Sequence, residues 1–262
     1  MANKQAASLT NEQLQEVLPL IKGADSVELK LTVPDTDHAS AVASLEMDVL
    51  QAQIRQVVFL DTPDLALNQA GLVLRLRRVQ GRQGDTVVKL RPIDPAQIAP
   101  DVRSSSTFGI EVDAMPGGFV CSGTMVRDLD DLKVKEGMAG TRPIAKLFTK
   151  EQRRFYATWA PDGLALDDLT RLGPINVLKL KLNPPELGRR VVAELWFYPD
   201  GTRLLELSTK CAPSEAFEVA AQTKAFLGDH DIKLTGRQAT KTKTALGYFS
   251  GQAARARAAS TP

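Results

Sequence analysis

The amino-acid sequence predicts an α+β protein, an antiparallel β-barrel or sandwich with helices packed on its outside. Two observations predict the sheet. Apolar and polar residues alternate over most of the chain after residue 25, and clusters of Gly, Pro and Asp separate the alternating runs at steady intervals. Shorter stretches with helical spacing interrupt these runs, and 262 residues suffice to bury a core of useful size.

The chain is expected to begin with an arm and a short helix over residues 1–24. Residues 1–9 have no periodic pattern and are interpreted as a flexible start. Leu14, Val17 and Ile21 then follow at helical spacing until Gly23 ends the run.

A single barrel domain is predicted over residues 25–249, because no linker divides this range. The segments that alternate as strands do are 26–33, 55–62, 71–79, 85–92, 108–115, 151–160, 163–168, 175–182, 190–198 and 203–210. Helical patterns are expected at about 38–50, 124–136, 214–228 and 238–248. The low-complexity tail, residues 250–262, is predicted to be disordered.

The composition excludes several classes of function. The 33 basic residues nearly balance the 31 acidic ones, so no general nucleic-acid-binding surface is expected. Cys121 and Cys211 form no CxxC motif, and His38 and His230 are too few to support a zinc site or a histidine-activated nucleophile. No apolar run approaches the ~18 residues of a membrane span, and the start lacks a secretory signal, so we expect a cytoplasmic protein without membrane contact.

Basic side chains gather on one face of two neighbouring predicted strands. Alternate residues of a strand share a face, which places Arg75 with Arg77 and Lys89 with Arg91. A solvated outer face would explain either strand alone. Such a face usually interleaves the two signs, however, because like charges opposite one another are unfavourable. The block of cations therefore indicates an anion.

Carboxylates cluster in the same way on other strands. Glu28 shares a face with Lys30, Glu111 shares one with Asp113, and Glu206 lies on the last predicted strand. A closed barrel would satisfy both sets of charges if these faces point inward onto a polyanion such as triphosphate, bridged by Mg²⁺ or Mn²⁺.

Residues 59–78, FLDTPDLALNQAGLVLRLRR, resemble the signature of the CYTH family, in which an aromatic-x-Asp-Thr segment leads to an Arg-x-Arg strand. Downstream segments resemble later strands of the family in the expected order: TVVKLR, GIEVD, QRRFY, and RLLELSTK with its following helix. The resemblance spans about residues 25–248. The family includes thiamine triphosphatases, inorganic triphosphatases and class IV adenylate cyclases.

The resemblance implies an eight-stranded antiparallel barrel, the triphosphate tunnel, with Mg²⁺ or Mn²⁺ as cofactor and a triphosphate-containing small molecule or polyphosphate as partner. The residues that would bind this substrate are Lys30, Arg75, Arg77, Lys89, Arg91, Arg154 (or Arg153) and Lys210. Those that would hold metal or orient water are Glu28, Glu111, Asp113, Asp167 (or Asp168) and Glu206. The catalytic residues would be Glu28, Lys30 and Glu111.

Two positions depart from the family pattern. Ser26 replaces the first glutamate of the Glu-x-Glu-x-Lys strand, and Ser208 stands where the last strand usually carries a second glutamate. Serine is a weak neutral ligand for Mg²⁺, so the metal affinity should be lower, although Glu194 could replace the lost acidity. The sequence therefore leaves two functions open: metal-dependent hydrolysis of a triphosphate, or a non-catalytic module that binds triphosphate, polyphosphate or a nucleotide.

Five further residues are interpreted through common structural roles. Asp61 is expected to hold a turn, and Trp159 and Trp196 are expected to pack in the core. Lys241 and Lys243 are expected on a solvated helix face, although they could instead close the tunnel mouth over phosphate. An adenylate cyclase would also need a base pocket and a group that activates the ribose hydroxyl, and the sequence identifies neither.

Overall fold

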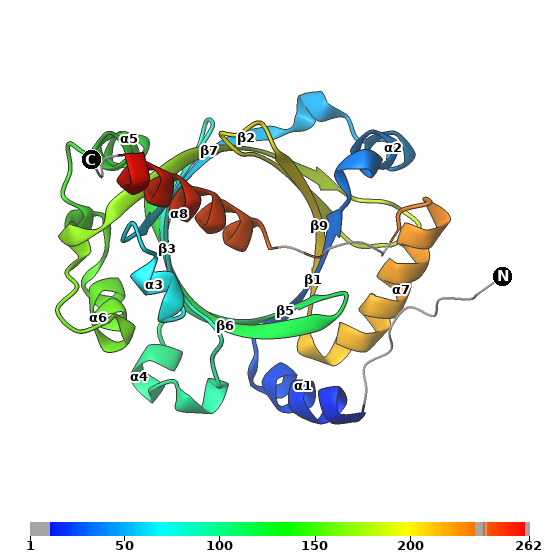
Figure 1. The fold of residues 1–262 in the computed structure, drawn as a ribbon. Helices are drawn as coiled ribbons and strands as arrows, with labels where there is room; N and C mark the ends of the chain where they lie inside the picture. Colours follow the sequence, from blue (N-terminus) through cyan, green and yellow to red (C-terminus); the bar gives the residue numbers. More distant parts are fainter. Residues whose placement is uncertain (1–10, 234–237, 239, 260–262) are drawn as a thin grey trace.

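Nine β-strands close into a barrel in the computed structural model of this chain, which describes residues 11–233, 238 and 240–259 (Figure 1). The strands are β1 (Ser26–Val33), β2 (Gln53–Asp61), β3 (Leu72–Val79), β4 (Gly84–Leu90), β5 (Phe108–Met115), β6 (Gly118–Leu129), β7 (Thr170–Leu182), β8 (Val191–Phe197) and β9 (Arg203–Cys211). Their order around the barrel is β1-β5-β6-β4-β3-β2-β7-β8-β9, and β9 pairs with β1 to close the ring.

The barrel is mixed, because β1 pairs in parallel with β5 while the other neighbours are antiparallel. The α+β barrel is confirmed, but the prediction of eight strands, all antiparallel, was wrong. A parallel pair needs a long crossover, and the chain supplies it by forming β2, β3 and β4 before it returns to β1. The parallel register places Glu28 beside Asp113.

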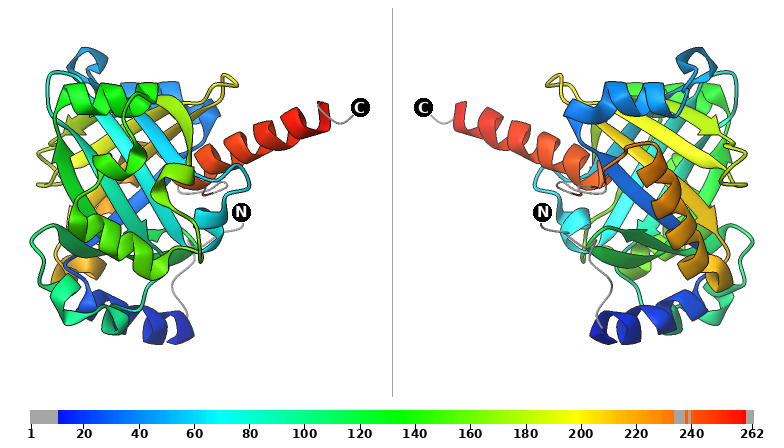
Figure 2. Two further views of the ribbon diagram at one scale, coloured as in Figure 1. Left: turned by 90° about the vertical axis from the view of Figure 1, so that its left-hand side faces the viewer. Right: turned by 90° about the vertical axis from the view of Figure 1, so that its right-hand side faces the viewer.

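Helices surround the ring of strands (Figure 1). Those in the described residues are α1 (Asn11–Gly23), α2 (His38–Ser44), α3 (Ala66–Gln69), α4 (Pro100–Arg103), α5 (Asp131–Ala139), α6 (Lys150–Trp159), α7 (Ala216–Asp229) and α8 (Lys241–Ala259). Figure 2 shows that α8 differs from the others, since it begins at one end of the barrel and projects away from it. None of the described helices combines the length and apolar character needed to cross a membrane.

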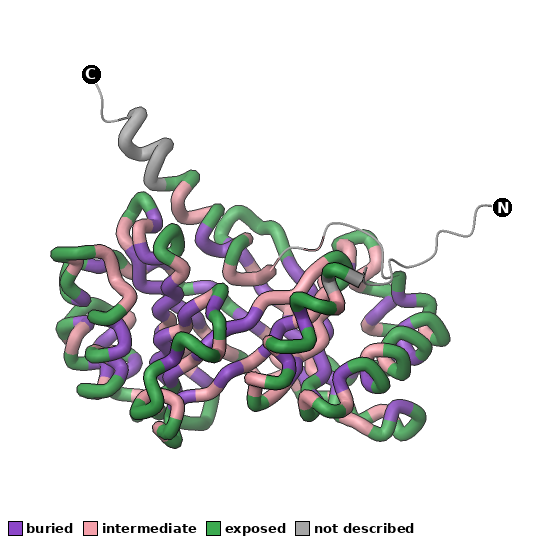
Figure 3. Tube along the Cα trace, turned by 90° about the horizontal axis from the view of Figure 1, so that it is seen from below, coloured by how far each residue is buried: buried purple, intermediate pink, exposed green. Residues whose placement is uncertain are grey.

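The apolar faces of the strands point outward and pack beneath the helices. On β3, Leu72, Leu74 and Leu76 are at most 1% exposed and belong to an apolar cluster that includes residues of α1, α5, α6 and α7. Arg75 and Arg77 alternate with these leucines and face the interior. In Figure 3 the exposed residues concentrate on the helices and loops, while much of the barrel wall is buried. The alternation in the sequence therefore assigned the two faces of β3 correctly.

Helix α6 replaces a predicted strand at residues 151–160. Its buried residues Gln152, Phe155 and Tyr156 have helical spacing, and Thr149 begins the helix with a capping box. The prediction of a strand was wrong because the buried residues of this segment, which include the polar Gln152, repeat with the period of a helix.

Two other segments also differ from their predictions. The expected strand at 163–168 is a loop that ends in a short 3-10 helix, Leu166–Asp168. The expected helix at 124–136 is divided, because β6 continues to Leu129 and α5 begins only after Asp130, whose side chain accepts a hydrogen bond from the backbone N–H of Lys133.

The C-terminal helix α8 is longer than predicted. It reaches Ala259 and so enters the tail for which disorder is expected, while residues 1–9 and 260–262 lie outside the described part of the chain. Near its start, Ala245 and Leu246 belong to the apolar cluster that contains Phe59 and Trp196, two residues of the barrel interior.

Candidate functional site

The barrel surrounds a cavity of about 830 Å³ that is lined by side chains from all nine strands and from the start of α8. Among the described residues, ten basic and seven acidic side chains line it, a net charge of about +3. Small barrels usually fill their interior with packed side chains. An open, highly charged interior is instead suited to a charged ligand.

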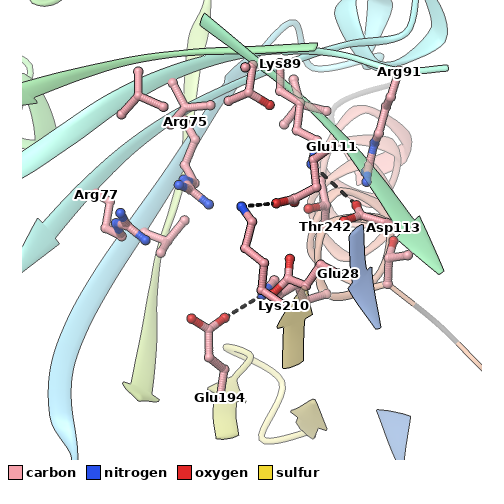
Figure 4. A pocket seen from close by; sticks show the side chains of 18 of the residues that line it. Glu28, Arg75, Arg77, Lys89, Arg91, Glu111, Asp113, Glu194, Lys210 and Thr242 are labelled. Carbon is pink, nitrogen blue, oxygen red and sulfur yellow. Dashed lines mark hydrogen bonds and ion pairs between the residues drawn. The ribbon is translucent and has the colours of Figure 1, made fainter. Parts of the chain in front are cut away.

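One wall of this cavity is basic. Arg75 and Arg77 of β3, Lys89 of β4 and Arg91 just after β4 point into the cavity (Figure 4). The buried carboxylate of Asp85 balances part of this charge, since Arg77 Nε donates to Asp85 Oδ2 at 2.7 Å and Arg75 Nη2 lies 3.6 Å from Asp85 Oδ1. Arg75 Nε is buried without a hydrogen-bond partner in the described residues. The basic wall therefore has more positive charge than its own carboxylate neutralises.

Burial makes the charged form costly for Arg75, Lys89 and Arg91. Burial lowers the pKa of Arg75, and the neighbouring charge of Arg77 lowers it further. Burial likewise lowers the pKa of Lys89 and of Arg91. A phosphate anion on this wall would supply both the missing charge and acceptors for the guanidinium N–H groups.

Next to Lys89 of the basic wall, the cavity carries a triad of carboxylates, Glu28, Glu111 and Asp113, from each of which one oxygen lies within 4.8 Å of the others. The parallel pairing of β1 with β5 produces this triad, because it places Ser26 beside Glu111 and Glu28 beside Asp113. Three hard oxygen donors at this separation fit Mg²⁺ or Mn²⁺.

Lysines surround the carboxylate triad. Lys30 Nζ lies 2.7 Å from Asp113 Oδ1 and 3.0 Å from Glu28 Oε2. Lys89 Nζ lies 3.4 Å from Asp113 Oδ2, and Lys210 Nζ lies 2.5 Å from Glu111 Oε2. Each carboxylate therefore already has a lysine partner.

The three carboxylates differ in pKa. Burial raises the pKa of Glu111, and the charges of Glu28 and Asp113 raise it further. Burial alone would also raise the pKa values of Asp113 and Glu28, but the charges of neighbouring lysines lower them more. Both pKa values therefore lie below their usual range, and that of Asp113 lies far below it. Glu111 is therefore the carboxylate of the triad that most readily takes up a proton.

A third charged group, which we call the Lys241 cluster, consists of Glu194, Glu206, Lys179, Arg55 and Lys241. Lys241 Nζ lies 2.5 Å from Glu194 Oε2 and 2.8 Å from Glu206 Oε1. Lys179 Nζ lies 3.2 Å and Arg55 Nη1 lies 3.8 Å from Glu194 Oε1. The interpretation of Lys241 as part of a solvated helix face was therefore wrong.

Most of the predicted site residues come together in this cavity, but two lie outside it. Arg154 is on the outer helix α6, where its side chain is 80% exposed and forms an ion pair with Asp101. Asp167 accepts a hydrogen bond from the backbone N–H of Ala145 on the outside of the barrel. Neither side chain lines the cavity.

The other interpretations can be compared with the structure. Asp61 accepts hydrogen bonds from the backbone N–H groups of Leu67 and Asn68, which confirms its role in the turn. Trp196 is 2% exposed and stacks on Phe59, which confirms its place in the core. Trp159 packs, partly buried, against the outer apolar cluster.

Sequence reasoning missed Asp85 and undervalued Lys241. Asp85 shares the face of Lys89 on one predicted strand, so its parity alone could have placed it on the inward face, beside the arginines that it contacts. Lys241 follows Thr240, whose Oγ accepts a hydrogen bond from the backbone N–H of Lys243 at the start of α8. A threonine at this position could have indicated where the helix begins, but no local pattern shows that the helix begins at one end of the barrel, with Lys241 lining the cavity.

Comparisons with known proteins are consistent with this architecture. No family model and no curated protein matches the sequence. Among solved structures, the chain is similar to a putative adenylyl cyclase from Hippeastrum that is described as having a dominant triphosphatase activity, with 17% identity, a TM-score of 0.62 and coverage of 84% of this chain and 95% of the other. It is also similar to a putative adenylate cyclase from Bacillus halodurans, with 11% identity, a TM-score of 0.58 and coverage of 84% and 97%. At these identities the likeness shows a shared fold, which agrees with the resemblance to the CYTH family.

Proposed function

We propose that this chain is a CYTH-type protein that binds a triphosphate-containing molecule in its barrel and hydrolyses it with the help of a divalent cation. The observation that carries this proposal is the division of one cavity into a basic wall and a carboxylate triad. A triphosphate bridged by a cation is a ligand that satisfies both, because arginines suit phosphate oxygens and carboxylates suit Mg²⁺ or Mn²⁺.

In the proposed mechanism, the basic wall of Arg75, Arg77, Lys89 and Arg91 holds the phosphate oxygens. Guanidinium forks orient the phosphates and stabilise negative charge that develops on the transferred phosphoryl group. Glu28, Glu111 and Asp113 would hold the cation, which supplies charge neutralisation and substrate orientation.

In this mechanism, a carboxylate of the triad takes up the proton that the attacking water loses. Glu111 is suited to orient water and accept its proton, because its carboxylate belongs to the triad at which the cation would be held. Lys30 fixes the positions of Glu28 and Asp113 by its contacts with both.

The proposal is tested by measuring phosphate release from inorganic triphosphate, thiamine triphosphate and nucleoside triphosphates, each with Mg²⁺, Mn²⁺ or a chelator. We expect release from at least one substrate that depends on the metal and is lost in Asp113→Asn. Arg154→Ala is the matched control, because it removes a charge from the outside of the barrel. No metal-stimulated release from any substrate would contradict hydrolysis.

A non-catalytic triphosphate-binding module is the second candidate function. Each carboxylate of the triad already has a lysine partner, and Ser26 and Ser208 stand where the family pattern has glutamates, so both features weaken the site for a metal. Anion binding by the basic wall does not require a metal. Calorimetry with inorganic triphosphate and chelator distinguishes the two. Tight binding without metal and without turnover supports the module, and absence of any binding contradicts both functions.

Adenylate cyclase activity is less well supported. Three aromatic residues line the cavity in the described part of the chain. Phe59 and Trp196 are each 2% exposed and lie in a cluster with α8 residues, and Phe108 is 8% exposed and belongs to the outer apolar cluster, so none offers an open face on which a base could stack. Formation of cyclic AMP from ATP would overturn this view.

A further inference from the structure

Lys241 is the feature of the cavity that the proposed function leaves unexplained. Its ammonium group lies between the carboxylates of Glu194 and Glu206, which are directly opposite one another on β8 and β9. It also lies 5.7 Å from the centre of the Trp196 ring. A cation held between two buried carboxylates occupies the kind of place that a metal ion takes in other sites.

The chain fixes Lys241 in this place from two sides. Thr240 caps α8 by accepting a hydrogen bond from Lys243 N. Before it, the Gln238 side chain accepts from Thr32 N at 2.9 Å and donates to Thr32 O at 3.3 Å. Thr32 is the cross-strand partner of Glu206, so this anchor holds the start of α8 beside that carboxylate.

A lysine in the first turn of a helix is unfavourable by itself, because the N-terminal end of a helix carries partial positive charge. The first turn of α8 contains no acidic residue to offset it. The carboxylates of Glu194 and Glu206, which line the cavity, instead offset the unfavourable interaction of Lys241 with the end of its helix. The charge of Lys241 therefore serves the barrel interior and not the helix.

We infer that Lys241 supplies, from within the chain, the positive charge that a second divalent cation would otherwise bring to Glu194 and Glu206, so that the tunnel takes one divalent cation per triphosphate, at the carboxylate triad. This inference rests on the proposed function for its ligand. The excess of basic over acidic groups along the cavity agrees with it. A triphosphate with one divalent cation keeps negative charge to match that excess, and a second cation would cancel much of it.

The test is the number of Mn²⁺ ions bound per chain in the presence of inorganic triphosphate, counted by equilibrium dialysis or from the electron paramagnetic resonance signal of free Mn²⁺. We expect one for the wild type and two for Lys241→Ala, because Glu206 and Glu194 then lose the ammonium group they share. Lys241→Arg should keep one, since the charge remains. Lys243→Ala is the matched control, because Lys243 is exposed on the same helix, and it should also keep one.

A double variant separates a new metal site from a general loosening of the fold. Lys241→Ala combined with Glu206→Gln should return to one Mn²⁺, because one carboxylate of the proposed second position is gone. Without triphosphate, Mn²⁺ should raise the melting temperature of Lys241→Ala more than that of the wild type. If Lys241→Ala does not fold, Lys241→Gln keeps most of the side-chain length and serves for the same comparison.

Two Mn²⁺ ions in the wild type, or no gain in either neutral Lys241 variant, would overturn the inference. Absence of Mn²⁺ from the wild type would contradict the metal site of the proposed function instead. In that case a gain of one ion in Lys241→Ala would still support the role of Lys241.

Discussion

At the scale of single residues, Arg77 tests whether the basic wall binds phosphate. Arg77→Ala should weaken binding of inorganic triphosphate by about ten- to a hundredfold, because a charge-assisted contact contributes roughly 1.5–3 kcal/mol. The change should also lower stability without ligand, because Asp85 loses its hydrogen-bonded partner and keeps only Arg75, at 3.6 Å. Calorimetry and thermal unfolding measure the two effects.

The control for Arg77 is Arg154→Ala, which removes the same charge from an exposed position on α6. It should leave both triphosphate affinity and melting temperature close to those of the wild type. Unaltered affinity in Arg77→Ala would show that the basic wall is not the phosphate site.

Glu194 provides a prediction about pH. Burial raises its pKa, but the charges of Lys241 and Lys179 lower it more, and the result lies far below the usual 4.5. The ionised form is therefore the one that stabilises the fold. This stabilisation is present above pH 4.5 and is lost as the pH falls towards the folded-state pKa. The pKa of Lys241 is raised, so its contribution is lost only above its usual value of 10.5 and does not affect the acid range.

Glu194→Gln should therefore be less stable than the wild type at pH 7, by about 3–5 kcal/mol for a buried pair that loses one partner. The difference should shrink as the pH falls below 4.5. Denaturant unfolding at pH 7 and at pH 3 measures it. The exposed Glu218→Gln on α7 should follow the wild type at both values. An equal deficit for Glu194→Gln at both pH values would contradict the assigned charge state.

How far the sequence predicts the site depends on which strand carries each residue. Parity alone placed Arg75, Arg77 and Lys89 on inward faces, because a strand fixes the relative positions of its own residues. It could not bring Lys241 to Glu206, since that contact depends on where α8 begins relative to the barrel. Long-range placement of this kind leaves no local pattern.

At the scale of elements, α6 shows where reading the local pattern fails. Its segment was interpreted as a strand carrying a tunnel arginine, whereas the structure has a helix that packs on the outside of the barrel through Gln152. Gln152 is polar but only 1% exposed. Because the helical period was sought among apolar residues, this buried position of the helix was not recognised. Strands β1, β3, β4, β5 and β9 were predicted well because apolar and polar residues alternate over most of their length and Gly, Pro or Asp clusters flank most of them.

Gln152→Leu tests the attachment of α6. The amide Nε2 donates to the backbone oxygens of Thr86 and Met125 at 3.1 and 3.3 Å. Leucine keeps the size but leaves these buried acceptors with one partner fewer, so unfolding free energy should fall by about 1–3 kcal/mol.

Denaturant unfolding measures this loss, with Arg154→Ala on the same helix as the control, expected within about 0.5 kcal/mol of the wild type. Triphosphate affinity of folded Gln152→Leu should be unchanged, because the side chain lies outside the tunnel. A loss of affinity as large as that of Arg77→Ala would contradict the separation of α6 from the site.

At the scale of the whole molecule, the parallel pairing of β1 with β5 is part of the closed barrel and also forms the carboxylate triad. The first and fifth strands lie far apart in the sequence, and composition and alternation contain no information about which strands pair. The same pairing places Glu28 next to Asp113 despite the repulsion of like charges. The two carboxylates can lie side by side only where lysines or a bound cation offset their repulsion. The strand pairing therefore connects the fold directly to the proposed metal site.

The most direct test of the central claim is a crystal structure of the wild-type protein with inorganic triphosphate and Mn²⁺. We expect phosphate density against Arg75, Arg77 and Lys89, and an anomalous peak for Mn²⁺ among the oxygens of Glu28, Glu111 and Asp113. Triphosphate or Mn²⁺ bound outside the barrel, with the barrel cavity occupied by neither at saturating concentrations, would contradict the proposed binding site.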